Sequence, residues 1–290
     1  LSSSSAASDV YKRQVLKVGK TLTTKKMDLN LKGKIAFISG STSGIGFTTA
    51  RILLEEGMKV YINGRKEETV NTAVTDLKKT TESNEVYGIV ADFRNPKEVL
   101  RLLQELPEID VLVNNVGIYN SQSFFETTSK QWEEQFQVNL MSGVSLSNHC
   151  LQKMLCKKWG RIIFISSECA YLVPNDMISY SATKAAIHAL SRGLSQLTRG
   201  TGVTVNTVVP GSTLSDGAKH FIANKAVKEG SNPKTVETDF FRKERTQSLL
   251  ERFASTDEVA TTIAYLCSPL SSATNGTVIK VDGGSTGSVF

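Results

Sequence analysis

Short apolar runs, rich in β-branched residues, alternate with amphipathic helical patterns along most of this chain. The runs are KIAFISG at residues 34–40, then KVYING, VYGIVAD, IDVLVNN, RIIFISS, GVTVNTVVP and GTVIKVDGG. A parallel return between neighbouring strands needs a crossover, which is usually a helix. The alternation therefore predicts an α/β chain built on one doubly wound, parallel, seven-stranded sheet in a single domain.

Local signals place several helix ends. Asn95 precedes Pro96, which suits an N-cap followed by a proline in the first helical turn. Ser255 and Glu258 have the spacing of a capping box and predict a helix through VATTIAYLC.

Residues 210–251 interrupt the alternation of strand and helix patterns, since they are polar and contain no strand pattern. A stretch of that length without a strand is more often functional than a simple connector, and we predict a substrate lid. Its phenylalanines, Phe221, Phe240 and Phe241, either line an apolar pocket or pack the lid onto the core.

The composition is ordinary for a globular protein, with 40% hydrophobic and 21% charged residues. No apolar run reaches the roughly 18 residues that a membrane-spanning helix needs. The net charge of +6 does not indicate nucleic acid, because six basic residues against Asp9 alone give residues 1–26 a charge of +5. We expect neither a membrane nor a nucleic-acid partner.

The cysteines and histidines show no metal-ligand or redox spacing, so no metal site is expected. Cys150, Cys156, Cys169 and Cys267 have the character of reduced packing residues, which is typical of a cytoplasmic protein. A reactive thiol at Cys169 is the alternative to an inert one.

Residues 1–26 are rich in serine and threonine and poor in acidic residues, as a mitochondrial transit peptide would be. The run SSAASDVYKRQ, however, matches the translation of an adapter used in sequencing libraries. We therefore expect residues 1–26 to be a non-native or disordered tail and residues 27–290 to form the folded domain, starting at Met27. The genomic DNA upstream of Met27 distinguishes this expectation from a targeting peptide.

A glycine-rich turn, GSTSGIG, follows the first predicted strand and leads into a helix. Glycines at positions 40, 44 and 46 allow the backbone to approach a pyrophosphate closely, and the helix N-terminus offers free N–H donors. In this position the turn predicts a dinucleotide site.

Several motifs together resemble the short-chain dehydrogenase/reductase family, in its 3-oxoacyl-carrier-protein reductase-like branch, whose fold is Rossmann-type. The likeness runs from Lys32 to Gly284 and includes the G-x-x-x-G-x-G spacing of the turn and NNVG at residues 114–117. Val116 stands where the family usually has alanine, which either narrows the space beside the cofactor or is a tolerated packing change.

Four further residues match the family's catalytic tetrad in order and spacing: Asn139, Ser167, Tyr180 and Lys184. Each alone has an ordinary structural explanation, but all four together with the glycine turn favour catalysis. Tyr180 is then the general acid/base, and it needs a pKa lowered from about 10 towards neutrality by the Lys184 ammonium. The resemblance implies that Lys184 also binds the nicotinamide ribose, that Ser167 polarises the substrate oxygen and that Asn139 positions a water.

The same resemblance implies which residues bind the cofactor. Asp92 corresponds to an aspartate near the adenine, and PGSTLS at residues 210–215 corresponds to the loop at the nicotinamide carboxamide. The full expected set is Gly40, Ser43, Gly44, Ile45, Gly46, Arg65, Asp92, Asn115, Gly117, Tyr180, Lys184, Pro210, Gly211, Thr213 and Ser215.

The end of the second strand indicates which dinucleotide binds. Enzymes of this fold that use NAD commonly carry an acidic residue there, which hydrogen-bonds the ribose hydroxyls. Here Gly64 takes that position and Arg65 the next, so a guanidinium is available for a 2′-phosphate. We predict NADP(H) over NAD(H). The alternative is that Arg65 is only solvated, and Ser43 supports it, since many NADP-preferring relatives carry a basic residue there.

These features predict an NADP(H)-dependent oxidoreductase that interconverts a small-molecule carbonyl and a secondary alcohol. The alternative is a non-catalytic dinucleotide sensor of the same fold, against which the complete tetrad argues. The resemblance also implies a homotetramer or homodimer. Residues 212–251 hold seven basic and six acidic side chains, so the sequence singles out no anionic substrate.

Overall fold

The sheet contains seven strands that are all parallel. They are β1 (Ile35–Ile38), β2 (Lys59–Gly64), β3 (Val86–Val90), β4 (Val111–Asn114), β5 (Trp159–Ile165), β6 (Gly202–Pro210) and β7 (Val278–Val281). Their spatial order is β3-β2-β1-β4-β5-β6-β7, which confirms the predicted doubly wound topology. This computed structural model describes residues 27–287, so the predictions for residues 1–26 lie outside it.

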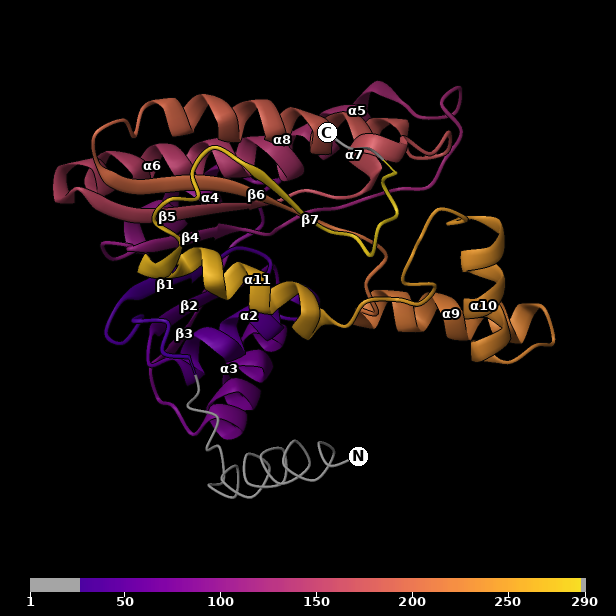
Figure 1. Cartoon of the computed structure of the whole chain (residues 1–290), viewed down its shortest axis with the longest axis horizontal. Helices are drawn as coiled ribbons and strands as arrows, with labels where there is room; N and C mark the ends of the chain where they lie inside the picture. The colour runs from indigo at the N-terminus through magenta and orange to yellow at the C-terminus, as the bar shows by residue number, and fades with distance from the viewer. Residues whose placement is uncertain (1–26, 288–290) are drawn as a thin grey trace, which may run out of the picture.

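Helices cover the sheet on both faces (Figure 1). One layer holds α2 (Gly44–Glu55), α3 (Glu67–Thr81) and α11 (Thr256–Cys267), whose apolar side chains share one core with the sheet. The other holds α4 (Pro96–Glu105), α6 (Ser142–Lys157) and α8 (Ile178–Gln196), which share a second core. Every residue of β4 is buried. Burial on both faces explains why the strands read as continuous apolar runs.

Two predicted helix starts are confirmed in detail. The Asn95 side chain accepts a hydrogen bond from the Lys97 N–H at 3.1 Å at the start of α4. Ser255 and Glu258 form a reciprocal capping box at the start of α11. These contacts occupy N–H groups that would otherwise lack intrahelical partners.

The helical region that precedes β5 contains a feature that the sequence analysis did not predict. Between α5 (Ser129–Phe136) and α6, residues Gln137–Met141 form one turn of π-helix. Such turns recur at functional sites, and this one carries Asn139. Its hydrogen-bond pattern leaves no mark on the hydrophobic periodicity, which is the only helix signal in the sequence here.

The topology places the carboxyl ends of β1 and β4 side by side at one edge of the sheet. β1 and β4 are neighbours, and from them the chain winds outwards in opposite directions. Ligands of doubly wound sheets bind in the crevice at the carboxyl ends of the strands, where the order reverses. The glycine turn after β1 and the NNVG segment after β4 both lie at this edge.

The predicted lid segment forms two helices that extend beyond the sheet, α9 (Asp216–Lys228) and α10 (Pro233–Lys243) (Figure 1). They enclose a small apolar core with Phe253: Ile222, Ala226, Val236 and Phe241. Phe240 packs against this cluster and also lines a cavity described below, as Phe221 does. The pocket-lining use is therefore found for Phe221 and Phe240, whereas Phe241 packs within the lid segment rather than onto the main core.

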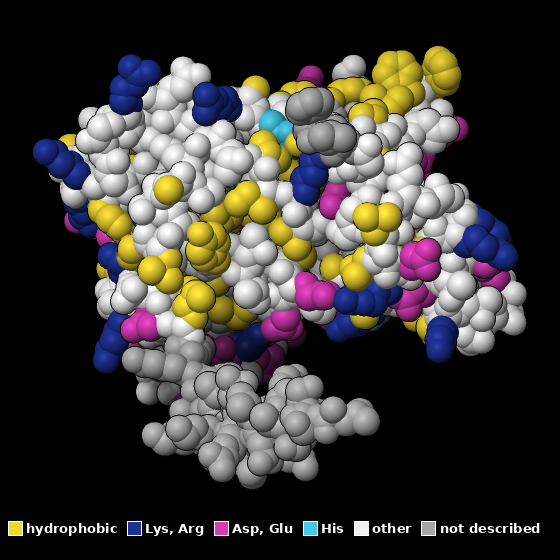
Figure 2. All heavy atoms as spheres, in the orientation of Figure 1, with side chains coloured by type: hydrophobic (Ala, Val, Ile, Leu, Met, Phe, Trp, Pro, Cys, Tyr) yellow, Lys and Arg dark blue, Asp and Glu magenta, His cyan; other side chains and the backbone are white. Residues whose placement is uncertain are grey.

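The surface of this segment is charged (Figure 2). Ion pairs join Lys225 to Glu244 at 3.2 Å and Lys243 to Asp239 at 2.7 Å. Exposed pairs of this kind contribute little to stability, so the apolar core of the segment holds its helices together.

The cysteine prediction needs one correction. Cys150, Cys169 and Cys267 are buried and free, as expected, but the free Cys156 is exposed on α6. Cys150 lies on the buried face of α6 with Leu146 and Met154, whereas Cys156 lies off that face and precedes Lys157 and Lys158. Among residues 27–287, no helix combines the length and the apolar character needed to cross a membrane.

Candidate active site

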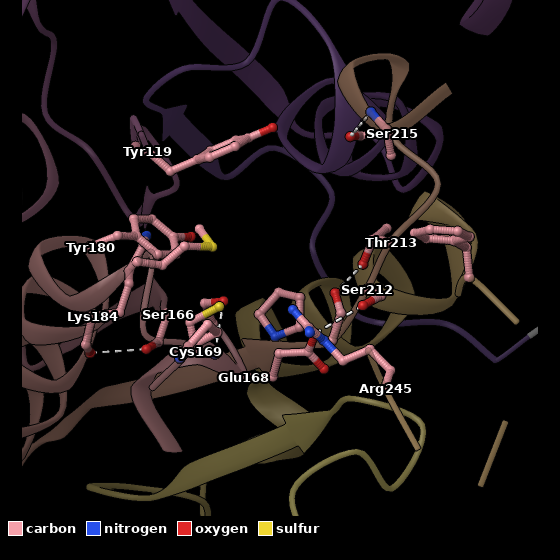
Figure 3. A pocket seen from close by; sticks show the side chains of 18 of the residues that line it. Tyr119, Ser166, Glu168, Cys169, Tyr180, Lys184, Ser212, Thr213, Ser215 and Arg245 are labelled. Carbon is pink, nitrogen blue, oxygen red and sulfur yellow. Dashed lines mark hydrogen bonds and ion pairs between the residues drawn. The ribbon is translucent and has the colours of Figure 1, made fainter. Parts of the chain in front are cut away.

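A cavity of about 450 Å³ opens at the carboxyl ends of β4, β5 and β6, beneath the lid segment (Figure 3). Its walls come from the turn after β5, from α8, from the loop after β6 and from the lid. The tetrad members Ser167, Tyr180 and Lys184 line it, together with Ile45, Asn115, Gly117, Pro210, Gly211, Thr213 and Ser215 of the predicted cofactor set.

Tyr180 and Lys184 lie one turn apart on α8, with the Lys184 Nζ 5.6 Å from the centre of the Tyr180 ring. Lys184 is only 3% exposed and donates a hydrogen bond to the Ile165 carbonyl at 2.9 Å. Burial lowers the pKa of the Lys184 ammonium to about 8. The amine thus remains mostly charged at neutral pH.

The pKa of Tyr180 does not follow the sequence prediction. Burial raises it, because the phenolate would lose hydration, and the neighbouring Cys169 raises it further. A hydrogen bond with Ser167 acts in the lowering direction but does not offset the burial. The expectation of a pKa lowered towards neutrality is therefore wrong for this arrangement. Tyr180 keeps its proton at neutral pH, as a proton donor must.

Asn139 is buried, and its side chain ties three segments together. Its Oδ1 accepts from the Ile118 N–H at 2.7 Å, while its Nδ2 donates to the Ile118 carbonyl and to Thr183 Oγ1. A Cβ placed on Gly117 would lie 3.2 Å from the Lys184 Nζ and 3.5 Å from Asn139 Oδ1. Asn139 therefore fixes the turn after β4 against α8, close to the Lys184 amine.

Two residues of this cavity escaped the sequence analysis. Tyr119 meets Tyr180 edge to face, with ring centres 6.0 Å apart. Glu168 follows Ser167 and is buried, paired with Arg245 of the lid segment at 2.8 Å. The available signal for Glu168 was a charged residue three positions after the end of β5 and next to a tetrad member.

The glycine turn has the shape of a phosphate cradle. A Cβ on Gly40 would lie 2.8 Å from the Val116 Cα, and one on Gly46 would lie 2.5 Å from the Asn115 Nδ2. No larger residue fits at either position. The contact with Gly40 also shows that Val116 packs against the turn. This agrees with the explanation that valine in place of alanine is a tolerated packing change.

The start of α2 suits an anion. Ser43 is its N-cap residue but makes no side-chain capping bond, and the first turn carries no acidic residue. The first N–H groups are thus not capped by a side chain, and the helix dipole favours a negative group there. The residues present fit the pyrophosphate of a dinucleotide.

A second cavity, of about 290 Å³, lies on the other side of the glycine turn. It is lined by four further members of the predicted cofactor set, Gly40, Ser43, Arg65 and Asp92, and it shares Asn115 and Gly117 with the first cavity. Gly44 and Gly46 line neither cavity. Asp92 pairs with Arg94, which lowers the pKa of its carboxyl group. Arg65 is exposed at the mouth. The two cavities thus adjoin at Asn115 and Gly117, beside the glycine turn.

The loop after β6 lies against the glycine turn that follows β1. Ser215 lies close to the glycine turn, since its Cβ is 3.5 Å from the position of a Cβ on Gly44. Its hydroxyl accepts from the Ala218 N–H at 3.4 Å and so caps α9. Position 215 thus joins the start of the lid to the cofactor turn.

A family model described as short chain dehydrogenase matches residues 34–226. The chain belongs to this family. An uncharacterized oxidoreductase of Bacillus subtilis is 42% identical over 264 residues, covering 91% of this chain and all of that protein. The 3-oxoacyl-[acyl-carrier-protein] reductase of Aquifex aeolicus is 30% identical over 262 residues, covering 89% of this chain and 99% of that protein.

Among solved structures, the L-sorbose reductase of Gluconobacter frateurii in complex with NADPH and L-sorbose has a TM-score of 0.85. It is 26% identical, and the match covers 91% of this chain and all of that one. These comparisons confirm the predicted family and its 3-oxoacyl-carrier-protein reductase-like branch. The chain is an NAD(P)-dependent short-chain oxidoreductase that acts on CH–OH groups, and the sensor alternative is not favoured.

Proposed function

We propose that this oxidoreductase uses NADP(H) to interconvert a small carbonyl compound and its secondary alcohol, with Tyr180 as general acid/base. The observation that carries the proposal is the meeting of Ser167, Tyr180 and Lys184 in one cavity that adjoins the glycine turn. The cofactor, when bound, supplies the hydride for reduction or accepts it in the reverse direction.

The residues of the chain divide the remaining work. The Ser167 and Tyr180 hydroxyls hold the carbonyl oxygen, and Tyr180 gives its proton to that oxygen as negative charge develops on it. The Lys184 ammonium stabilises the phenolate that is left and binds the nicotinamide ribose. Asn139 positions the turn beside Lys184. We propose that Asn139 also positions a water molecule, as the family resemblance implies.

The preference for NADP(H) rests on the end of β2. Gly64 offers no carboxylate, and a Cβ there would lie 2.5 Å from the Thr42 Cγ2 and 2.9 Å from the Val70 Cγ2. An acidic side chain at position 64 is therefore excluded by packing as well as absent. Arg65 lies at the mouth of the same cavity and carries the positive charge that a 2′-phosphate requires.

Turnover tests the function directly. The full chain is mixed with NADPH and a panel of ketones and aldehydes, and oxidation of the cofactor is followed by absorbance. Turnover of at least one carbonyl compound is expected. Tight cofactor binding with no turnover across the panel would instead support the sensor.

The rate of reduction is expected to fall as the pH rises through about 8. The Lys184 pKa is about 8, so its ammonium is present below that pH and is lost above it, while Tyr180 keeps its proton throughout. The other titratable groups near Lys184 are Cys169 and His188. The measurement is kcat/KM against pH at constant ionic strength.

The control is Lys184→Ala. Its residual activity should be low and should not fall as the pH rises through about 8. Its affinity for the cofactor should also be weaker than that of wild type. A wild-type profile that stays flat to pH 10 would remove the charged Lys184 from the mechanism.

The lid is expected to become protected when ligand binds, as active-site covers do. Lys228 at the end of α9 and Lys234 at the start of α10 are exposed and offer sites for trypsin. Cleavage within residues 210–251 should slow on addition of NADP(H), and further with substrate. Equal cleavage rates with and without ligand would contradict a mobile lid.

The chain is also expected to be a cytoplasmic homodimer or homotetramer. Sedimentation of the full chain at micromolar concentration measures its assembly state. A single monomeric species would contradict the oligomer.

A further inference from the structure

Glu168 is a buried carboxylate at the floor of the active-site cavity, and only one of its two oxygens is satisfied. Its Oε1 accepts from the Arg245 Nε at 2.8 Å and from the Ser212 hydroxyl at 2.8 Å. Its Oε2 has no hydrogen-bond partner among residues 27–287, although the side chain is only 4% exposed. Figure 3 shows Ser212 and Arg245 beside Glu168, on the side of the cavity away from Tyr119.

The backbone holds this side chain in place. The Glu168 N–H donates to the Pro210 carbonyl at 2.9 Å, and its own carbonyl accepts from the N–H groups of Tyr171 and Leu172. These bonds fix the main chain at Glu168, and the bonds from Arg245 and Ser212 hold its carboxylate. A buried polar atom without a partner is costly, and native structures that retain one usually have a functional reason.

The charges around the cavity narrow the choice of ligand. Arg245 neutralises Glu168, so the unpartnered Oε2 calls for a hydrogen-bond donor rather than for a cation. Asp176 and Glu244 also line the cavity, as do Lys184 and Arg245, and Glu244 is paired with Lys225. Three carboxylates and two cations do not favour an anionic substrate. A neutral hydroxyl group can donate a hydrogen bond to Oε2 without adding charge to the cavity.

We propose that Glu168 Oε2 accepts a hydrogen bond from a hydroxyl group of the substrate, which makes the substrate a hydroxylated ketone of the ketose or polyol type. The inference deepens the proposed function and rests on it. Ser167 and Glu168 are neighbours in the chain, with Cα atoms about 3.8 Å apart. Ser167 holds the reacting oxygen, so the recognised hydroxyl lies within a few carbons of the carbonyl. A plain alkyl or acyl chain would leave Oε2 buried and unpaired.

The simpler explanation is that Glu168 only anchors the lid through Arg245. Two matched variants separate the explanations. Glu168→Gln keeps the size and one acceptor oxygen but replaces the other oxygen with an amide donor. Arg245→Gln removes the lid contact and leaves the Glu168 carboxylate in place. An anchoring role predicts equal losses for all substrates in both variants.

The test compares kcat/KM for erythrulose, a hydroxylated ketone, with that for butanone in the full-length chain with NADPH. Wild type is expected to favour erythrulose at least about tenfold, and Glu168→Gln should reduce that ratio by about tenfold or more, since hydrogen bonds to charged groups are the stronger ones. Arg245→Gln should lower both rates and keep the ratio. The double variant Glu168→Leu/Arg245→Leu replaces the whole pair with apolar groups, a change that buried pairs often tolerate, and should lose the preference.

Calorimetric titration with D-sorbitol gives a readout that does not need turnover. Weaker binding of D-sorbitol by Glu168→Gln supports the inference even if no ketone is reduced, an outcome in which the proposed function alone would fail. Turnover with the same erythrulose-to-butanone ratio in wild type and Glu168→Gln would overturn the inference and leave the proposed function intact. A wild-type preference for butanone would overturn it as well.

Discussion

Tyr180→Phe is expected to lower kcat for carbonyl reduction by a factor of about 10² to 10⁴. The substitution removes the transferable proton but keeps the ring, which contacts Tyr119 edge to face. Cofactor affinity should stay close to that of wild type, because little contact area is lost. Steady-state rates with NADPH and fluorescence titration of NADPH measure the two effects separately.

Tyr119→Phe is the matched control, since it makes the same chemical change on the exposed neighbouring ring. It should keep most of the activity. If Tyr180→Phe retained more than about a hundredth of the wild-type rate, the general-acid assignment would be wrong.

Arg65→Ala is expected to lower kcat/KM for NADPH by roughly tenfold to a hundredfold, with little change for NADH. A guanidinium in contact with a 2′-phosphate makes charge-assisted hydrogen bonds, each worth about 1.5 to 3 kcal/mol, and NADH lacks that phosphate. Parallel kinetics with the two cofactors, using one ketone at a fixed concentration, measure the effect.

Lys66→Ala is the control for Arg65, because Lys66 is the next residue and is also basic and exposed. It should change both cofactors little. Equal losses for NADPH and NADH in Arg65→Ala would show that Arg65 is only a solvated residue at the start of α3.

The raised pKa of Tyr180 bears on the direction of the reaction. A tyrosine that keeps its proton at neutral pH is in the protonation state that carbonyl reduction requires. Oxidation of the alcohol needs the phenolate, and raising the pH favours that form while it removes the charge of Lys184. The two directions should therefore respond differently to alkaline pH.

The features that the sequence determined are those with local patterns. Parallel strands buried on both faces are apolar throughout, so the central strands could be recognised as runs. The edge strands β3 and β7 are less buried but keep enough apolar residues to be recognised as well. The Asn95 and Ser255 caps occupy the N–H groups within one helical turn, so their spacing alone marks the helix starts. Tyr180 and Lys184 share a helix face because they are four residues apart. The glycine turn could be recognised because the neighbouring segment lies too close for any residue with a Cβ.

Tertiary structure decided whatever depends on burial or on distant segments. The direction of the Tyr180 pKa is set by the water that the surrounding fold excludes, which no spacing in the chain records. Glu168 meets Arg245 across 77 residues of sequence, and only the docking of the lid buries the pair. The match to the family's spacing thus identified the tetrad, while the fold determined the pKa values of its residues and the burial of Glu168 beside it.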